Sequence, residues 1–180
     1  MPDIEMKAQS PDDISFEDVM ASNRAFAAAK RERLRAYLLA SQPELVEAYD
    51  REAAAFARLS DTVLAPMLGR IAEGAQAQGW HARVVRDSAT DGITGMATPG
   101  IRLIASRSPL PDPDADASSG SVSFIGFHGR CPVHQVEMTA VVHSADRMAS
   151  EESDSRVLGY DALTAESVES LVVDFLKKLG

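Results

Sequence analysis

The chain of 180 residues is 45% hydrophobic and 25% charged, which is the composition of a folded domain and excludes wholesale disorder. Its formal charge of −9 argues against the concentrated cationic surface that nucleic-acid binding requires and against contact with acidic membranes. A single cysteine cannot form an intramolecular disulfide, and no stretch approaches the roughly 20 apolar residues that span a bilayer, so we expect a cytoplasmic protein with no nucleic-acid or membrane partner.

The N-terminal quarter predicts a tail followed by a long helix. Residues 1–15 are acidic, contain two prolines and offer little to bury, so we expect a disordered tail. From Phe16 to Leu38 the apolar residues recur at helical spacing. The basic run at 30–35 is interrupted by Glu32 and lacks interleaved aromatic residues, which favours a solvated helix face over a nucleic-acid contact.

A second helical segment follows directly. Ser41-Gln42-Pro43-Glu44 matches a capping box, in which the serine hydroxyl accepts a backbone N–H and proline occupies the first turn. Pro66 leaves two alternatives open: a kink within this helix, or a third helix capped by Asp61. Both give a helical hairpin over residues 16–79.

After Gly79 the apolar period changes from helical spacing to alternation, which indicates strands. Residues 87–100, which include Gly92, Gly95 and Pro99, predict a long connecting loop, and the acidic Pro/Gly/Ser segment 108–120 predicts another. The alternating apolar residues are Trp80, Ala82 and Val84 in the first strand and Ile101, Leu103 and Ala105 in the second.

Residues 121–144 predict a β-hairpin at the centre of the fold, because they are the most apolar stretch with alternating spacing. We place its turn at 129–133, which sets His128 opposite His134 and Phe124 opposite Met138. The predicted apolar row facing the C-terminal helix is Val122, Phe124, Val136, Met138 and Val142.

The C-terminal quarter predicts a polar loop over 146–155, a short fifth strand near Val157, and an amphipathic helix over 163–179 with Thr164 as its N-cap. We therefore predict an α+β fold: an N-terminal helical hairpin, a four- or five-stranded antiparallel meander, and a C-terminal amphipathic helix packed on the sheet. Residues 80–180 hold the sheet and last helix, and residues 16–180 form one folding unit.

The sharpest candidate for chemistry is His128, Cys131 and His134 around the hairpin turn. In the predicted register the two imidazoles face each other and the thiol lies between them, a ligand set suited to a zinc or copper ion. The same residues also fit a thiolate nucleophile activated by an imidazole. The simpler interpretation is that all three are structural residues of a turn, with no bound cofactor.

The reverse side of the predicted sheet carries an apolar strip that needs cover. Either the N-terminal helices lie across it, or it is an interface with another protein. The strip consists of Val85, Ile104, Ile125, Phe127 and Val141.

No phosphate-binding loop, serine-hydrolase elbow or HExxH motif is present in the chain. We therefore expect a non-enzymatic, protein-binding protein of adaptor or chaperone type that self-associates through its N-terminal helices. The alternative is a small-molecule-binding or hydrolytic domain with a site near His128, Cys131 and His134, closed by the loop over 87–100.

Overall fold

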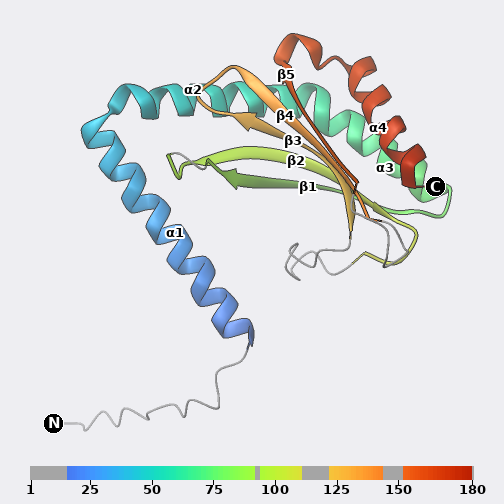
Figure 1. Ribbon diagram of the computed structural model, residues 1–180, viewed down its shortest axis with the longest axis horizontal. Helices are drawn as coiled ribbons and strands as arrows, with labels where there is room; N and C mark the ends of the chain where they lie inside the picture. Colours follow the sequence, from blue (N-terminus) through green and yellow to red (C-terminus); the bar gives the residue numbers. More distant parts are fainter. Residues whose placement is uncertain (1–15, 92–93, 111–121, 144–151, 180) are drawn as a thin grey trace, which may run out of the picture.

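The computed structural model describes residues 16–91, 94–110, 122–143 and 152–179. The predicted tail over 1–15 and most of the predicted loop over 108–120 lie outside these residues. The described chain contains helices and one five-stranded antiparallel sheet, which confirms the α+β class. Figure 1 shows the N-terminal helices, the sheet and the C-terminal helix in chain order.

Three α-helices precede the sheet: α1 (Phe16–Ser41), α2 (Pro43–Leu59) and α3 (Ala65–Ala77). A π-helical turn, Ser60–Leu64, joins α2 to α3 with the backbone still in the right-handed helical region, so the kink alternative is correct and Asp61 caps no new helix. The bend falls just before Pro66, which lacks the N–H needed for a helical hydrogen bond.

The predicted capping box at the start of α2 is wrong. Ser41 is the last residue of α1, and its hydroxyl donates to the carbonyl of Tyr37 at 2.8 Å. Gln42 takes the N-cap position of α2 without a side-chain hydrogen bond, while Pro43 does occupy the first turn. The Ser41 hydroxyl bonds within α1 because the chain stays helical up to this residue.

The five strands form a meander in the order β1-β2-β3-β4-β5, each antiparallel to its neighbours. Their bounds are β1 His81–Thr90, β2 Ala97–Ser106, β3 Ser123–Arg130, β4 Gln135–Val142 and β5 Glu152–Gly159. The predicted loop over 87–100 is wrong, because β1 and β2 pair as far as Thr90 and Ala97. Pro99 is tolerated there because β3 pairs with β2 only from Gly100 onward.

The predicted register of the central hairpin is also wrong. Met138 pairs with Phe127, and Phe124 pairs with Val141, so Phe124 and Met138 lie on opposite faces of the sheet. The observed register places Ile125 and Phe127 in the core, whereas the predicted one would have put Phe124 and Gly126 there. Because side chains alternate along a strand, a shift by an odd number of residues exchanges the two faces.

The C-terminal part contains more strand than the sequence predicted. β5 begins at Glu152, inside the predicted loop over 146–155, because backbone pairing with β4 holds polar residues on an edge strand whose side chains reach water. A 3₁₀ turn, Tyr160–Ala162, leads to α4 (Ala165–Leu179). The Thr164 hydroxyl accepts the Ser167 N–H at 3.2 Å, which confirms the predicted cap.

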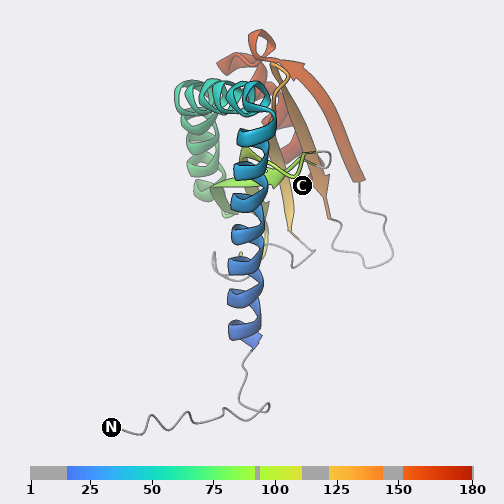
Figure 2. The same ribbon diagram turned by 90° about the vertical axis from the view of Figure 1, so that its left-hand side faces the viewer.

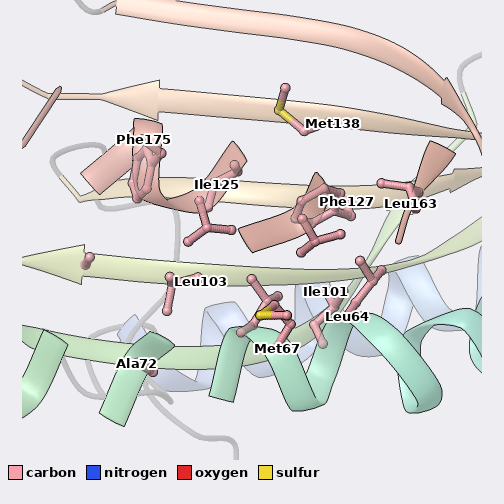
Figure 3. Packing of buried hydrophobic residues seen from close by; sticks show 14 of the residues in the cluster. Leu64, Met67, Ala72, Ile101, Leu103, Ile125, Phe127, Met138, Leu163 and Phe175 are labelled. Atoms are coloured by element: carbon pink, nitrogen blue, oxygen red, sulfur yellow. The ribbon is translucent and has the colours of Figure 1, made fainter. Parts of the chain in front are cut away.

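One hydrophobic core joins α2, α3 and α4 to a single face of the sheet (Figure 3). Figure 2 shows α2 and α3 together on one side of the strands, and the core residues of α4 pack on the same face. The N-terminal helices α2 and α3 therefore do not cover the reverse face, which we call the outer face. The core side chains include Phe56, Leu64 and Leu68 from the helices before the sheet, Ile101, Leu103, Ile125, Phe127, Val136 and Met138 from the sheet, and Val168, Val172 and Phe175 from α4.

A smaller cluster, the second core, fixes the C-terminal end of α1 to the body. It consists of Leu38, Val46, Tyr49, Met96 and Cys131, with Leu34 and Leu45 packed against it. Gly95 has a φ of +67° and leaves room for Leu34, whose Cδ2 would lie 2.6 Å from a β-carbon there. From this anchor α1 runs past the β1 edge and away from the sheet (Figures 1 and 2).

Candidate functional site

The structure does not bring His128, Cys131 and His134 together as the metal hypothesis requires. His128 pairs across the sheet with Glu137 on the outer face. His134 lies in the turn, 63% exposed, with its Nδ1 2.9 Å from Glu52 Oε2 and its ring 4.1 Å from that of Tyr160. Among residues 16–91, 94–110, 122–143 and 152–179, no group of three or more His, Cys, Asp or Glu side chains is placed to hold a metal ion. The prediction depended on the wrong register.

Cys131 belongs to the second core, where it is only 4% exposed. Burial, and then the negative charges of Glu52 and Asp91, raise the pKa of its thiol to about 11. The thiol is therefore protonated at neutral pH, and this geometry gives no support to a thiolate nucleophile.

The predicted interface strip is divided between the two faces of the sheet. Ile125 and Phe127 are 1% and 0% exposed in the core beneath α3 and α4, so they do not belong to a surface. Val85, Ile104 and Val141 lie on the outer face, because they share cross-strand rows with Arg102 and Phe124. The wrong hairpin register is the cause of this error as well.

A polar cluster on the outer face is built over Gly100. Asp87, Gly100 and His128 are cross-strand neighbours on β1, β2 and β3. A β-carbon on Gly100 would collide with the His128 ring and lie 2.5 Å from Asp87 Oδ1, so these two side chains lean over the position that a side chain would fill. His128 Nε2 thereby lies 3.2 Å from Asp87 Oδ1, although the two residues are two strands apart.

Arg102 completes this cluster from β2. Its Nε lies 3.1 Å from Asp87 Oδ2, and its guanidinium carbon lies 5.7 Å from the centre of the Phe124 ring. Burial would raise the pKa of Asp87, but His128 and then Arg102 outweigh burial and leave that pKa lowered. Asp87 is therefore an ionised carboxylate at neutral pH, held between an imidazole and a guanidinium.

A groove of about 620 Å³ opens at the end of the outer face, where α2 meets the β1–β2 connection and the β3–β4 turn. His128 and Cys131 both line it, whereas His134 does not. Glu137 and Thr139 of β4 form one side.

The opposite side of the groove is a hydrogen-bonded wall. Thr94 donates its backbone N–H at 2.6 Å and its hydroxyl at 2.8 Å to Asp91 Oδ1. The Tyr49 hydroxyl lies 2.8 Å from the Thr94 hydroxyl and is the donor of that pair, because the proton of Thr94 is directed to Asp91. This wall connects α2 to the β1–β2 connection and fixes the shape of the groove.

Sequence reasoning missed Asp87 and Arg102 because it placed the first in a loop and gave the second no role. Gly100 and Gly126 carried a usable signal. Glycine inside an apolar strand marks a close approach of other groups. Gly126 also contacts this cluster, since a β-carbon there would lie 3.4 Å from His128 Cε1 and from Arg102 Cβ.

The second candidate surface is α1. Every residue from 21 to 33 is exposed, and the large apolar side chains of Val19, Phe26 and Tyr37 are 44%, 72% and 67% exposed. These three are separated by 7 and 11 residues, close to two and three helical turns, so they lie on one face of the helix. This stripe has no partner among the described residues of the chain.

No protein family, curated protein or solved structure matches this chain. Within the described residues, none of the helices combines the length and the apolar character that crossing a bilayer demands.

Proposed function

We propose that this protein is a non-enzymatic protein-binding protein that works as a homodimer, with α1 as its binding element. The observation that carries the proposal is the uncovered stripe of α1, in which Phe26 is 72% exposed. Water-exposed aromatic residues in register along a helix are typical of a helix that pairs with another helix. A cytoplasmic location is part of the proposal and is supported by the presence of one cysteine only.

Charge favours an antiparallel orientation for a second copy of α1 on the stripe. Lys30 and Arg33 follow Phe26 by four and seven residues on the stripe side. In an antiparallel pair centred on Phe26, these two cations lie beside Ser22 and Val19 of the other helix, away from the cations of the partner. A parallel pair would instead set the basic halves against each other. An antiparallel pair satisfies the two-fold symmetry of a homodimer, with Phe26 of each copy facing Phe26 of the other.

The second core holds α1 in a fixed direction relative to the body. Leu34 and Leu38 are held against α2 and the β1–β2 connection, while the N-terminal part of α1 extends from the body (Figure 2). The helix direction is thereby set by the body, which reduces the entropy lost when two copies pair.

The test is the oligomeric state of the full chain over a concentration series, measured by sedimentation velocity. We expect a reversible dimer for the natural sequence and a monomer for Phe26→Asp, because two facing carboxylates would replace the apolar contact at the centre of the pair. Leu39→Asp is the matched control. It lies on α1 and is 54% exposed, but 13 residues from Phe26 it faces the other side of the helix, so its dimer should persist.

A natural chain that stays monomeric at every concentration would refute the proposal. So would a dimer that survives Phe26→Asp unchanged, since the contact would then lie elsewhere.

A further inference from the structure

We infer that the seam between α3 and α4 is a binding site for a small organic carboxylate with a hydrocarbon body, such as a medium-chain fatty acid. A groove of about 550 Å³ opens there, and we call it the α3–α4 groove. Its lining comes from these two helices and from Trp80 and Arg107, which lie just outside β1 and β2. Figure 1 shows α3 and α4 at the end of the molecule away from α1, so the site is separate from the proposed dimer contact.

Arg107 is the group that would recognise the carboxylate. Pairing of β1 with β2 ends at His81 and Ser106, so Trp80 and Arg107 come together directly beyond the last pair. The guanidinium carbon of Arg107 lies 3.7 Å from the centre of the Trp80 ring. At this distance the guanidinium presents its flat face to the indole, and its N–H donors point outward along its edge. A carboxylate can accept a parallel pair of these donors.

The α3–α4 groove differs in charge from the chain as a whole. Its described lining contains two cations, Arg107 and Lys177, and no carboxylate, in a chain whose formal charge is −9. Lys177 is paired with Asp174 at 3.0 Å, whereas Arg107 has no carboxylate partner within the part of the chain that the structure describes. The net charge of the chain does not attract an anion, so the preference for a carboxylate must come from Arg107 itself.

The apolar part of the lining fits a hydrocarbon chain. Ile71 of α3 and Leu176 of α4 are half-buried, and Val173 of α4 is 37% exposed. A hydrocarbon along the seam would remove this surface from water while the head group meets Arg107. Gly74 keeps the groove open, because a β-carbon there would meet no atom within 4 Å.

The test uses three probes with one hydrocarbon chain and different head groups: octanoate, 1-octanol and octylamine. Trp80 is the only tryptophan of the chain, so its fluorescence reports on the groove directly during titration of the full chain at neutral pH. We expect octanoate to change this fluorescence saturably and to bind more tightly than the neutral and the cationic probe.

Arg107→Gln tests the recognition of the head group. It should weaken octanoate by about two- to fivefold, the range of an exposed charge pair, and leave the affinity for 1-octanol unchanged. Arg156→Gln removes an exposed guanidinium on β5, outside the lining, and is the matched control. This control should bind octanoate as the natural chain does.

Gly74→Leu tests the apolar part of the groove. The new side chain enters open space and replaces glycine by a better helix former, so the fold should hold while octanoate and 1-octanol both bind more weakly. Gly69→Leu is equally open on the same helix but lies outside the lining, so its binding should not change. Octanoate that binds no more tightly than the other two probes, or that withstands both Arg107→Gln and Gly74→Leu, would overturn the inference.

Discussion

Cys131 shows how position in the fold sets the chemistry of a side chain. In the sequence it lies between two histidines in a polar turn, which is typical of a reactive or metal-binding thiol. In the structure it packs against Leu38 and Val46 in the second core, and its sulfur is withdrawn from water. The thiol is therefore a packing group, and its rise in pKa follows from its burial.

We predict that Cys131 of the native protein reacts slowly with iodoacetamide. A pKa raised from 9.0 to about 11 lowers the thiolate fraction about a hundredfold at pH 8, and higher nucleophilicity restores about tenfold of that. The native rate should thus be at least about tenfold below that of the urea-unfolded chain and should still rise with pH above 9. Alkylation of the native chain at the rate of a free thiol would contradict this.

Gly100 and Gly126 represent the other residue-scale feature. Neither position needs left-handed backbone, and their importance lies in the space that they leave on the outer face. Gly100 allows side chains from β1 and β3 to meet above β2, because a β-carbon at this position would collide with both of them. The polar cluster therefore depends on the missing side chain at Gly100 as much as on Asp87 and His128.

At the scale of elements, α1 and α4 show opposite ways of using a helix. α4 buries Val168, Val172 and Phe175 in the core, and its amphipathic pattern predicted this correctly. α1 has apolar residues on more than one side, and among its residues 19–41 only Leu38 is buried. The stability of its exposed part therefore depends on the anchor and, in our proposal, on pairing with a second copy.

We predict that Leu38→Ala loosens α1 without unfolding the body. The change removes a buried side chain from the second core, and truncating a core leucine lowers stability by about 2–5 kcal/mol. The loss weakens the contacts that hold the C-terminal end of α1 to the body. Hydrogen exchange should therefore accelerate over residues 19–41 while the strands keep their protection. Leu39→Ala, the adjacent leucine that is 54% exposed, is the control and should change exchange little. Equal effects of the two substitutions, or loss of protection in the sheet, would contradict the prediction.

At the scale of the whole molecule, the charged residues and the helices that cover the sheet are unevenly distributed. From Val19 to Ser41, α1 carries five basic residues and one acidic residue, in a chain whose formal charge is −9. The helices α2, α3 and α4 cover one face of the sheet and leave the other without a helical layer from these three. The molecule thus carries a basic helix on an acidic chain, and the proposed dimer contact lies on that helix.

We predict that the proposed dimer persists as salt rises. Apolar contact along the stripe is not screened, and salt screens the repulsion between the basic residues of the two copies, with a screening length of about 3 Å at 1 M. The dissociation constant should therefore stay level or fall between low salt and 1 M, measured by sedimentation equilibrium. A dimer that weakens steeply with salt would indicate an interface held by charge pairs instead.

The sequence by itself determined the elements: the helical N-terminal part, the alternating strands of a meander, the amphipathic last helix and its Thr164 cap. Each of these elements depends on residues that are close in the sequence, so the local spacing of apolar residues predicts it. Only the tertiary structure decided the hairpin register, because β3 has apolar residues on both of its rows, Phe124 on one and Ile125 and Phe127 on the other, and packing against α3 and α4 selects between them. The exposure of α1 and the meeting of Asp87 with His128 over Gly100 were likewise decided there, since they join residues that no local pattern connects.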